Sequence, residues 1–413
     1  MLSGLRHISS ILVKPAGPDC NLACRYCFYR SAAALYPDRP VHRMSDEVLE
    51  SVICQYMAIA GPLASFGWQG GEPTLMGLPF FERVVQLQHR YGLGGQKVSN
   101  GLQTNGVLID DDWARFLAQW KFLVGLSLDG PAEIHDHYRR DHGGRATHAR
   151  VLEALHHLQH ARVDTNVLCM VTDASVTRAR ELFDYFYGLG IRWMQFIPCV
   201  ETHPDGGWES YSLDVAEYGQ FLCALFDLWY GGMNLKRTYI RDFEELLINV
   251  TTGRPPSCVP SDHCGDYVVV EHNGDVYACD FHVTPEWRLG NLMETPLLEL
   301  VNSPTMERFA AAKRQWDRSC TTCPWLNLCH GGCPKYRINA NGAPARKTCF
   351  CAANLELFRH AGDTLRELAD RYGPPSVLHR VPEVHDASSG VRGNAPCPCG
   401  SGRKYKHCCM KRG

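Results

Sequence analysis

The sequence lacks the apolar features that direct a chain into or across a membrane. No apolar run approaches the length of a membrane-spanning helix, and residues 1–14 contain no uncharged apolar segment followed by a small-residue cleavage site. An excess of charge is also missing, since the formal net charge of the 413 residues is −2. These absences predict a soluble, cytoplasmic protein with no membrane partner and no overall preference for nucleic acid.

Cysteine, in contrast, is abundant, with 20 residues. Because no export signal precedes them, these thiols are expected to stay reduced and to bind metal instead of forming disulfides. Four of them stand alone in apolar segments and are predicted to be buried structural thiols, namely Cys54, Cys169, Cys199 and Cys223. A chain of this length can bury a large core in two or three domains.

Three cysteines lie close together near the N-terminus. Cys20, Cys24 and Cys27 form a C-x3-C-x2-C pattern that is followed by two aromatic residues. A cubane iron–sulfur cluster normally has four thiolate ligands, so three thiolates would leave one iron open for chemistry. The alternative is a structural zinc loop, which needs a fourth ligand nearby. The nearest downstream histidine is His42, beyond a proline-containing stretch.

This spacing, with its aromatic flank, resembles the signature of the radical S-adenosylmethionine (SAM) enzymes. The resemblance implies that Cys20, Cys24 and Cys27 hold a [4Fe–4S] cluster whose open iron is chelated by the amino and carboxylate groups of SAM. It also implies that an electron from this cluster cleaves SAM to a 5′-deoxyadenosyl radical. A motif match of this kind is a hypothesis that the structural context has to support.

Short apolar runs alternate with amphipathic segments in the first half of the chain. Strands are predicted at Ile11–Lys14, Ser65–Trp68, Lys97–Gln103, Phe122–Leu128, Thr165–Val171 and Trp193–Ile197. Helices are predicted at Ser45–Ala60, Pro79–Tyr91, Asp111–Gln119, His148–Gln159 and Val176–Tyr187, with helix starts at Ser45 and Asp110. Six such units predict an α/β fold with a parallel sheet. The resemblance implies a partial (β/α)6 TIM-like barrel of the radical SAM type.

Motifs follow the predicted strands at the end where a barrel places its active site. Gln69-Gly70-Gly71-Glu72-Pro73 resembles the GGEP element, whose backbone receives the SAM amino group, although a glycine pair alone more often forms a turn. The residues implied to contact SAM are Tyr26, Gln69, Gly70, Gly71, Glu72, Ser127 and Asp129. For Asp129 a turn cap is an equal alternative. The following His135-Asp136 pair and Arg139 make either a structural salt bridge or a ligand contact.

A further group of nine cysteines runs from Cys258 to Cys351. Eight thiolates can form two closed four-cysteine sites, which suit either iron–sulfur clusters or zinc. The spacing resembles the SPASM domain, which holds two auxiliary [4Fe–4S] clusters. The implied ligands are Cys258, Cys264, Cys279 and Cys333 for the first cluster, and Cys320, Cys323, Cys329 and Cys351 for the second. Cys349 is an alternative to Cys351, because the glycine and tyrosine that follow the last ligand in the family are absent here.

Six motifs most closely resemble the anaerobic sulfatase-maturating enzymes of the SPASM group, namely CNLACRYCFY, WQGGEPTL, GLQTNG, SLDGP, YACD and CHGGCPKYR. The resemblance runs from about Ile11 to His360 and implies oxidation of a cysteine or serine of a sulfatase to Cα-formylglycine. It assigns Asp280 as the general base, with an auxiliary cluster as electron acceptor and flavodoxin or ferredoxin as external electron donor. The alternative for Asp280 is a structural hydrogen bond near the cluster.

Two other functions stay open at this point. The first is maturation of another ribosomally synthesised peptide or protein through a thioether, a carbon–carbon bond or epimerisation. The second is a cluster-bearing adaptor that only transfers electrons, against which the intact SAM-binding motifs argue. A neighbouring sulfatase gene or a short precursor-peptide gene would distinguish the two enzymes.

The C-terminal residues carry a third group of cysteines. Cys397, Cys399, Cys408 and Cys409 form a C-x-C-x8-C-C pattern that resembles the SEC-C zinc-binding motif. About twenty residues cannot fold on apolar burial alone, so Zn²⁺ is expected to stabilise them. His407 is expected to face solvent. The lysines and arginines of this segment predict a basic face for an acidic protein, RNA or the ribosome.

These patterns divide the chain into five parts. The radical SAM barrel is predicted at residues 1–235, a connecting helix or linker at 236–257, the SPASM domain at 258–362, a helix and linker at 363–390, and the SEC-C module at 391–413. The expected cofactors are three [4Fe–4S] clusters, SAM and Zn²⁺.

Overall fold

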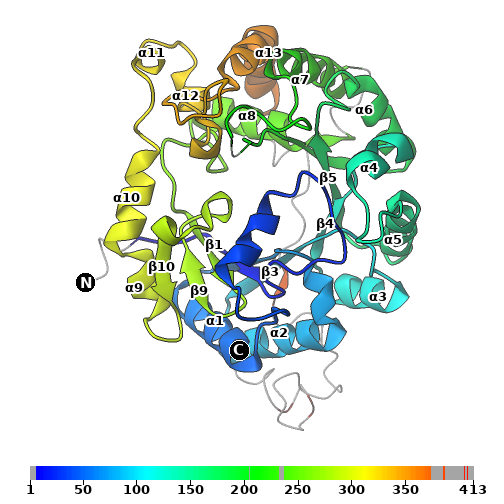
Figure 1. Cartoon of the computed structure of the whole chain (residues 1–413), viewed down its shortest axis with the longest axis vertical. Coiled ribbons are helices and arrows are strands. Elements are labelled where there is room, and N and C mark those ends of the chain that lie inside the picture. Colours follow the sequence, from blue (N-terminus) through cyan, green and yellow to red (C-terminus); the bar gives the residue numbers. More distant parts are fainter. Residues whose placement is uncertain are drawn as a thin grey trace.

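A computed structural model describes residues 6–203, 205–231, 237–373, 385–386, 404 and 407. In these ranges the chain forms one curved sheet with helices around its outer face (Figure 1). None of the helices described there combines the length and the apolar character needed to cross a membrane. The predicted zinc ligands Cys397, Cys399, Cys408 and Cys409 lie outside the described residues.

Six parallel strands form most of the sheet, and each pairs with the next one along the chain. They are β1 (Ser10–Lys14), β2 (Leu63–Trp68), β3 (Lys97–Thr104), β4 (Leu123–Ser127), β5 (Thr165–Val171) and β6 (Trp193–Pro198). The six predicted strands are therefore confirmed. A short strand, β7 (Tyr239–Ile240), continues past β6. The path through the described strands runs from β10 to β7 without returning to its start, so the barrel is not closed.

Helices connect these strands, as is typical of parallel sheets. They are α1 (Asp46–Ile59), α2 (Leu78–Tyr91), α3 (Asp111–Gln119), α4 (Ala132–Tyr138), α5 (His148–His160), α6 (Ala179–Gly188), α7 (Val215–Tyr230) and α8 (Arg241–Thr252). The side chains of Ser45 and Asp110 accept hydrogen bonds from Val48 N and Trp113 N, which confirms both predicted helix starts. The short helix α4 was not predicted.

The cysteine-rich half of the chain joins the same sheet. β8 (Tyr267–Glu271) pairs in parallel with β1, and β9 (Asp275–Tyr277) and β10 (Arg288–Asn291) extend the sheet in antiparallel fashion. The barrel and the predicted SPASM segment therefore share hydrogen-bonded strands. This pairing brings Cys279 and Asp280, which follow β9, next to the first strand of the barrel.

Short helices and one long helix complete the described part. They are α9 (Leu297–Val301), α10 (Pro304–Ala312), α11 (Arg318–Thr321), α12 (Leu326–Cys329) and α13 (Cys351–Tyr372), and α13 packs along α7 and α8. A two-residue strand, β11 (His385–Asp386), pairs with the first residues of β3. Lys335 Nζ forms an ion pair with Glu201 Oε1 at 2.5 Å, which joins the cysteine-rich half to the loop after β6.

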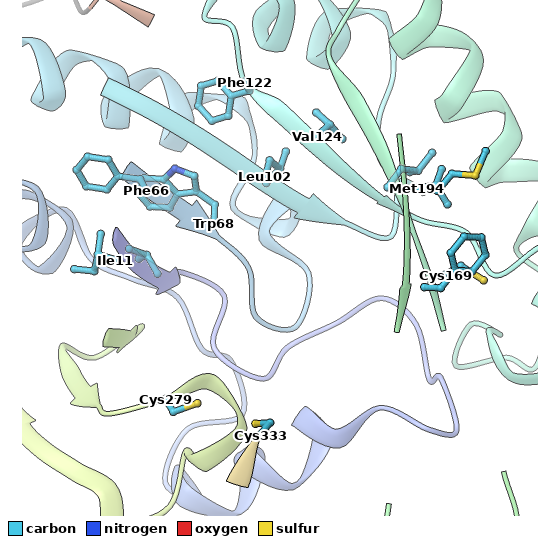
Figure 2. Packing of buried hydrophobic residues seen from close by; sticks show 14 of the residues in the cluster. Ile11, Phe66, Trp68, Leu102, Phe122, Val124, Cys169, Met194, Cys279 and Cys333 are labelled. Carbon is cyan, nitrogen blue, oxygen red and sulfur yellow. The ribbon is translucent and has the colours of Figure 1, made fainter. Parts of the chain in front are cut away.

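The main hydrophobic core lies between the sheet and its covering helices. Figure 2 shows side chains from neighbouring strands, among them Phe66, Trp68 and Leu102, packed side by side in this layer. Trp68 is completely buried, and its indole N–H donates to Asn100 Oδ1 at 2.9 Å, so its polar atom is satisfied. A rigid core of this kind holds the strand ends that carry the predicted motifs.

Candidate functional site

The loop with the first three cysteines follows β1 and crosses the inside of the curved sheet (Figure 1). Its backbone is held by the segment after α4. Ala23 N donates to Arg140 O at 2.8 Å, and Arg25 N donates to Tyr138 O at 3.1 Å. The loop that carries Cys20, Cys24 and Cys27, called the cluster loop below, is thus positioned by the fourth βα connection, far away in sequence.

The thiols of Cys20, Cys24 and Cys27 are neighbours in this loop. Burial raises the pKa of Cys20 to about 12, and the charges of Glu72 and the other two thiolates add to this increase. Burial also raises the pKa of Cys24, which the guanidinium of Arg139 opposes from 3.9 Å away. Metal coordination deprotonates a thiol outright. Three adjacent thiols beside a buried cation therefore fit an anionic cluster.

His42 does not complete a zinc site with these cysteines. Its Nδ1 lies 2.7 Å from Asp19 Oδ1, and its Nε2 lies 3.2 Å from the backbone oxygen of Tyr36. Both ring nitrogens are therefore already engaged. Across the described ranges, no group of three or more His, Cys, Asp or Glu side chains is placed to hold a single metal ion.

The glycine pair after β2 packs directly on the cluster loop. A Cβ atom at Gly71 would lie 1.9 Å from the backbone oxygen of Asp19, so no side chain fits there. Gly71 N donates to Gly17 O at 2.8 Å, and Glu72 N donates to Asp19 O at 2.7 Å. The close backbone approach expected at this motif is therefore an approach to residues 17–19.

Glu72 links the ends of two neighbouring strands. Its buried carboxylate accepts hydrogen bonds from Thr74 N at 3.0 Å, Thr74 Oγ1 at 2.6 Å, Thr104 Oγ1 at 2.7 Å and Asn105 N at 2.8 Å. Four protein donors thus satisfy a carboxylate that would be costly to bury without partners. Glu72 joins the loops after β2 and β3 through these contacts.

Asp129 makes the same kind of link after β4. One carboxylate oxygen accepts from the Tyr26 hydroxyl and from Arg139 Nε at 2.9 Å, and the other accepts from Met170 N at 3.0 Å. Asp129 is 2% exposed. Tyr26 belongs to the cluster loop, so this buried ion pair connects the loop to β4 and β5. The salt-bridge interpretation of Arg139 is confirmed.

The remaining predicted SAM contacts lie at the same ends of the strands. Ser127 is buried at the last position of β4. Gln69 N donates to Val13 O at 3.0 Å, and a Cβ atom at Gly70 would lie 3.2 Å from Lys14 Cβ. Asp136, by contrast, accepts from the backbone N–H groups of residues 147 and 148 and so caps the start of α5.

The cysteines predicted for the first auxiliary site are neighbours in the structure. Burial, followed by the charge of Cys333, raises the pKa of Cys258 to about 11. Burial also raises the pKa of Cys264 to about 12, and among the thiolates Cys333 and Cys258 contribute. Figure 2 shows the sulfur atoms of Cys279 and Cys333 turned toward each other. These neighbours support the predicted ligand set.

A second group forms around the start of α13. Burial raises the pKa of Cys320, and the nearby Cys329 and Cys351 thiolates raise it further. Cys323 N donates to Cys320 O at 3.1 Å, which places Cys323 one turn from that thiol. Asn354, one turn after Cys351, donates to Cys329 Sγ at 3.7 Å. The thiols of Cys320, Cys329 and Cys351 therefore gather in one place, and Cys323 lies in the adjacent turn.

Cys349 lies apart from this group. It packs against the main core, and its N–H donates to Tyr336 O at 2.8 Å. Burial raises its pKa to about 12, with no contribution from another thiol of the described chain. The choice of Cys351 as the last ligand is supported by these surroundings.

A pair of single substitutions tests this choice. Cys351→Ala is expected to lower the iron content by up to about four irons per chain, because an auxiliary cluster has no SAM to take the place of its fourth thiolate. Cys349→Ala removes a partly buried thiol that packs against the core, and this variant is expected to keep full iron content. Iron and sulfide per chain, measured after anaerobic reconstitution, compare the two variants. Iron loss in the Cys349 variant alone would reverse the assignment.

The four solitary thiols are only partly as predicted. Cys169 and Cys199 are buried, which confirms the prediction for these two. Cys54 and Cys223 are partly exposed, so the prediction of burial was wrong for them. Both lie on helices, α1 and α7, whose sides face the core and solvent in turn.

Asp280 forms a buried ion pair with Lys14, the last residue of β1. Lys14 Nζ contacts Asp280 Oδ1, and the side chains are 1% and 11% exposed. Asp280 N donates to the Tyr267 hydroxyl at 3.3 Å, and that hydroxyl lies 3.3 Å from Cys279 Sγ. The carboxylate is therefore oriented by a fixed cation and lies beside a predicted cluster ligand.

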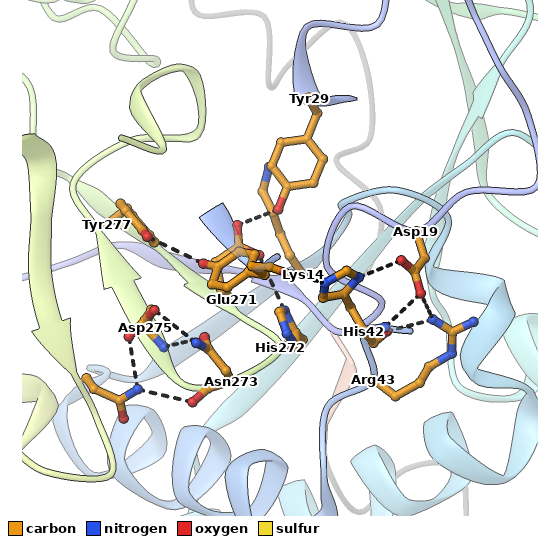
Figure 3. A network of polar contacts seen from close by, with 12 residues as sticks. Lys14, Asp19, Tyr29, His42, Arg43, Glu271, His272, Asn273, Asp275 and Tyr277 are labelled. Atoms are coloured by element: carbon orange, nitrogen blue, oxygen red, sulfur yellow. Dashed lines mark hydrogen bonds and ion pairs between the residues drawn. The ribbon is translucent and has the colours of Figure 1, made fainter. Parts of the chain in front are cut away.

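Lys14 is a residue that the sequence analysis missed. Its ammonium lies 3.4 Å from the centre of the Tyr29 ring, and the Tyr29 hydroxyl donates to Glu271 Oε1 (Figure 3). Lys14 and Glu271 are register partners in the β1–β8 pair. The signal in the sequence is a charged residue at the end of an apolar strand, because such a side chain needs buried partners.

Three family models match parts of the chain. The radical SAM superfamily matches residues 15–184, an iron–sulfur cluster-binding domain called SPASM matches residues 262–324, and the SEC-C motif matches residues 394–411. The first match contains Cys20, Cys24 and Cys27, the third contains the four C-terminal cysteines, and the second contains four of the eight predicted auxiliary ligands, namely Cys264, Cys279, Cys320 and Cys323. The third match supports the resemblance of the C-terminal residues to the SEC-C motif.

Curated relatives match most of the chain. The cysteine-type anaerobic sulfatase-maturating enzyme of Clostridium perfringens (strain 13 / Type A) is 39% identical over 363 residues, which is 87% of this chain and 98% of the relative. The serine-type enzyme of Bacteroides thetaiotaomicron is 34% identical over 391 residues, which is 89% of this chain and 94% of the relative. The sequence identity of this chain to the serine-type relative is therefore comparable to its identity to the cysteine-type relative.

Solved structures have the same fold. "Native anSMEcpe with bound AdoMet and Cp18Cys peptide" superposes with a TM-score of 0.81 at 38% identity and covers 88% of this chain and 99% of its own. Streptococcus suis SuiB bound to S-adenosylmethionine has a TM-score of 0.56 at 17% identity, covering 84% of this chain and 77% of its own. The SuiB similarity concerns the fold alone.

Proposed function

Because this chain belongs to the anaerobic sulfatase-maturating enzymes of the radical SAM class, we propose that it oxidises one cysteine or serine of a sulfatase to Cα-formylglycine. The observation that carries this proposal is 39% identity across 98% of the cysteine-type relative. Membership in a family of enzymes argues against the adaptor hypothesis. Maturation of another peptide is the second candidate function. The similarity to SuiB concerns the fold alone and does not favour this candidate.

The chain uses SAM and iron–sulfur clusters as a member of this family, and we propose three [4Fe–4S] clusters for it. When bound, SAM and the first cluster would supply a 5′-deoxyadenosyl radical that abstracts a Cβ hydrogen, and an auxiliary cluster would supply an acceptor for the second substrate electron. The thiol sets support the inventory, since the first set and the second auxiliary set each have three neighbouring thiols, the first auxiliary set has four, and Cys323 lies one turn from Cys320. A ratio of about twelve irons per reconstituted chain is the expected result.

The proposed SAM-binding residues divide into two kinds. The backbone at Gln69, Gly70 and Gly71 and the hydroxyl of Ser127 are proposed to contact SAM directly at the strand ends. Glu72 and Asp129 have carboxylates that protein donors already occupy, so we propose that they act on SAM by holding the surrounding loops. Tyr26 would contribute through its hydrogen bond to Asp129.

Asp280 is proposed as the general base that takes the proton from the substrate thiol or hydroxyl. A base must hold its oxygen in a fixed direction toward that proton. Lys14 supplies such a constraint, because it contacts one carboxylate oxygen and is itself buried. The other oxygen is the one we propose to face the substrate.

The proposal is tested with synthetic peptides. Reconstituted enzyme, SAM and a reductant are incubated anaerobically with two sulfatase-motif peptides that differ only in cysteine or serine at the target position. Mass spectrometry should reveal an aldehyde product from at least one of them, which also identifies the preferred residue. If SAM is cleaved and neither peptide is modified, the second candidate function replaces the first.

The electron source and the location of the enzyme are further parts of the proposal. A reduced flavodoxin or ferredoxin is proposed to supply the electron for SAM cleavage. Replacing the chemical reductant by reduced flavodoxin should sustain 5′-deoxyadenosine formation, and no formation with either protein would contradict this. A cytoplasmic location is proposed because cysteine thiolates stay reduced there. Cell fractionation would test it.

The C-terminal SEC-C segment is proposed to hold one Zn²⁺ and to recruit an acidic protein or a ribosome-bound substrate. Truncation after Asp386 is expected to remove about one zinc per chain, because four thiolates close one tetrahedral site. Iron content and activity on a short peptide should stay unchanged, whereas activity on a full-length sulfatase should fall. Metal analysis and the two assays measure these effects. Loss of peptide activity would show that the segment supports the catalytic domains instead.

A further inference from the structure

Lys313 lies completely buried at the end of α10, beside the first auxiliary site. Its Nζ donates to the backbone oxygen of Val259 at 2.9 Å and to that of Gly332 at 2.7 Å. Val259 follows the predicted ligand Cys258, and Gly332 precedes the predicted ligand Cys333. One ammonium group therefore ties together the backbone next to two ligands that are 75 positions apart in sequence.

Arg337 is a second buried cation next to Lys313. Its guanidinium donates to Lys313 O at 2.7 Å, to Gly331 O at 3.2 Å and to Gly332 O at 3.3 Å. Gly331 and Gly332 adopt positive φ angles of 72° and 70°. This left-handed turn, which glycine adopts at little cost, directs consecutive carbonyl oxygens toward the guanidinium. The turn connects one ligand of each auxiliary site, Cys329 and Cys333.

Both cations lack an anionic partner of the usual kind. Within the described residues, neither Lys313 nor Arg337 has a carboxylate oxygen within 4.0 Å, and their hydrogen-bond acceptors are neutral carbonyl oxygens. A buried charge without a counter-charge is strongly unfavourable. The neighbours that would carry negative charge once they hold a cluster are the thiols of Cys264, Cys333 and Cys258 for Lys313. For Arg337 they are the thiols of Cys264 and Cys333, followed by Cys320 and Cys329.

We propose that Lys313, supported by Arg337, is the buried counter-charge of the first auxiliary site and raises the reduction potential of the cluster held there. A cluster with four thiolates is anionic and gains one more negative charge on reduction. A cation in a low-dielectric interior stabilises the reduced form more than the oxidised form. Lys313 is a positioning residue in this proposal, because it acts on the cluster through the field and the ligand backbone.

This role deepens the proposed function and rests on it. In the proposed reaction the substrate would lose a Cβ hydrogen atom to the 5′-deoxyadenosyl radical, then a proton to Asp280 and one electron to the cluster that the first auxiliary site would hold. Asp280 follows Cys279, a predicted ligand of the same site, so the base and the electron acceptor are adjacent. A raised potential favours transfer of the electron away from the substrate.

The experiment measures potentials in a background that cannot cleave SAM. The Cys20→Ala, Cys24→Ala, Cys27→Ala variant is reconstituted, so that only the auxiliary sites hold clusters. Redox titration followed by electron paramagnetic resonance then compares Lys313→Met, Lys313→Gln and Lys313→Arg. Lys97→Met is the matched control, because Lys97 is exposed at the start of β3, where no cluster is predicted. No sulfatase substrate is needed, so failure here is separable from failure of the proposed function.

The expected result is a tenfold shift of one reduction equilibrium toward the oxidised form in the Met and Gln variants, equivalent to about 59 mV for a one-electron couple. The Arg variant and the Lys97 control should match the parent. Fully loaded Met or Gln variants with unchanged potentials would overturn the proposal. Iron loss in both neutral variants with full loading of the Arg variant would support the counter-charge, whereas iron loss in all three would assign Lys313 to packing and overturn it.

Discussion

Replacing Cys20, Cys24 and Cys27 together by alanine is expected to abolish SAM cleavage while about two thirds of the iron stays bound. The reason is that these three thiols belong to one loop, whereas the eight auxiliary cysteines lie in separate groups. Iron and sulfide analysis gives the first quantity, and 5′-deoxyadenosine measured by chromatography gives the second. No 5′-deoxyadenosine should be detected above the level of a reaction without enzyme.

The control for this variant changes thiols that no site uses. Cys54 and Cys223 lie on α1 and α7 and are partly exposed, so a double replacement by alanine should retain both iron and SAM cleavage. Unchanged iron content in the triple variant would show that the first site is wrongly assigned. Loss of nearly all iron would show that the cluster loop is needed for the auxiliary sites to form.

Asp280→Asn is expected to separate radical formation from product formation. SAM cleavage depends on the first site and should continue, while aldehyde yield should fall by about 10²-fold or more, the usual contribution of a general base. Both quantities are measured in the same reaction, as 5′-deoxyadenosine and as peptide aldehyde. Wild-type aldehyde yield would return Asp280 to a structural role.

Asp280→Asn also removes the anionic partner of the buried Lys14, so the variant is expected to lose stability as well as activity. Removing one partner of a buried pair costs about 3–5 kcal/mol, because the other charge stays buried alone. The double variant Lys14→Met, Asp280→Asn removes both charges and should recover stability in thermal unfolding without recovering aldehyde formation. Asp275→Asn, which removes the buried partner of the exposed Arg288, should keep aldehyde formation. Loss of aldehyde in the Asp275 variant would indicate a general effect of charge removal in this region.

The features that depend on nearby residues were predictable. The six parallel strands and the helix starts at Ser45 and Asp110 follow from apolar periodicity and from side chains that cap the next turn. The grouping of Cys20, Cys24 and Cys27 likewise follows from their spacing in one loop. These features are local, because periodicity, capping and short ligand spacing each act within a few residues.

The features that join distant segments were decided only by the tertiary structure. The pairing of β1 with β8 places Lys14 against Asp280, although 266 positions separate them. The packing of α10 places Lys313 between the segments that carry Cys258 and Cys333. The sequence around either residue does not indicate which distant group it will contact, because the contact depends on how the chain folds and not on the spacing of the two residues. The sequence by itself determined which chemistry is available, and the tertiary structure determined which charges act on it, because buried charges interact strongly only with the groups that folding places beside them.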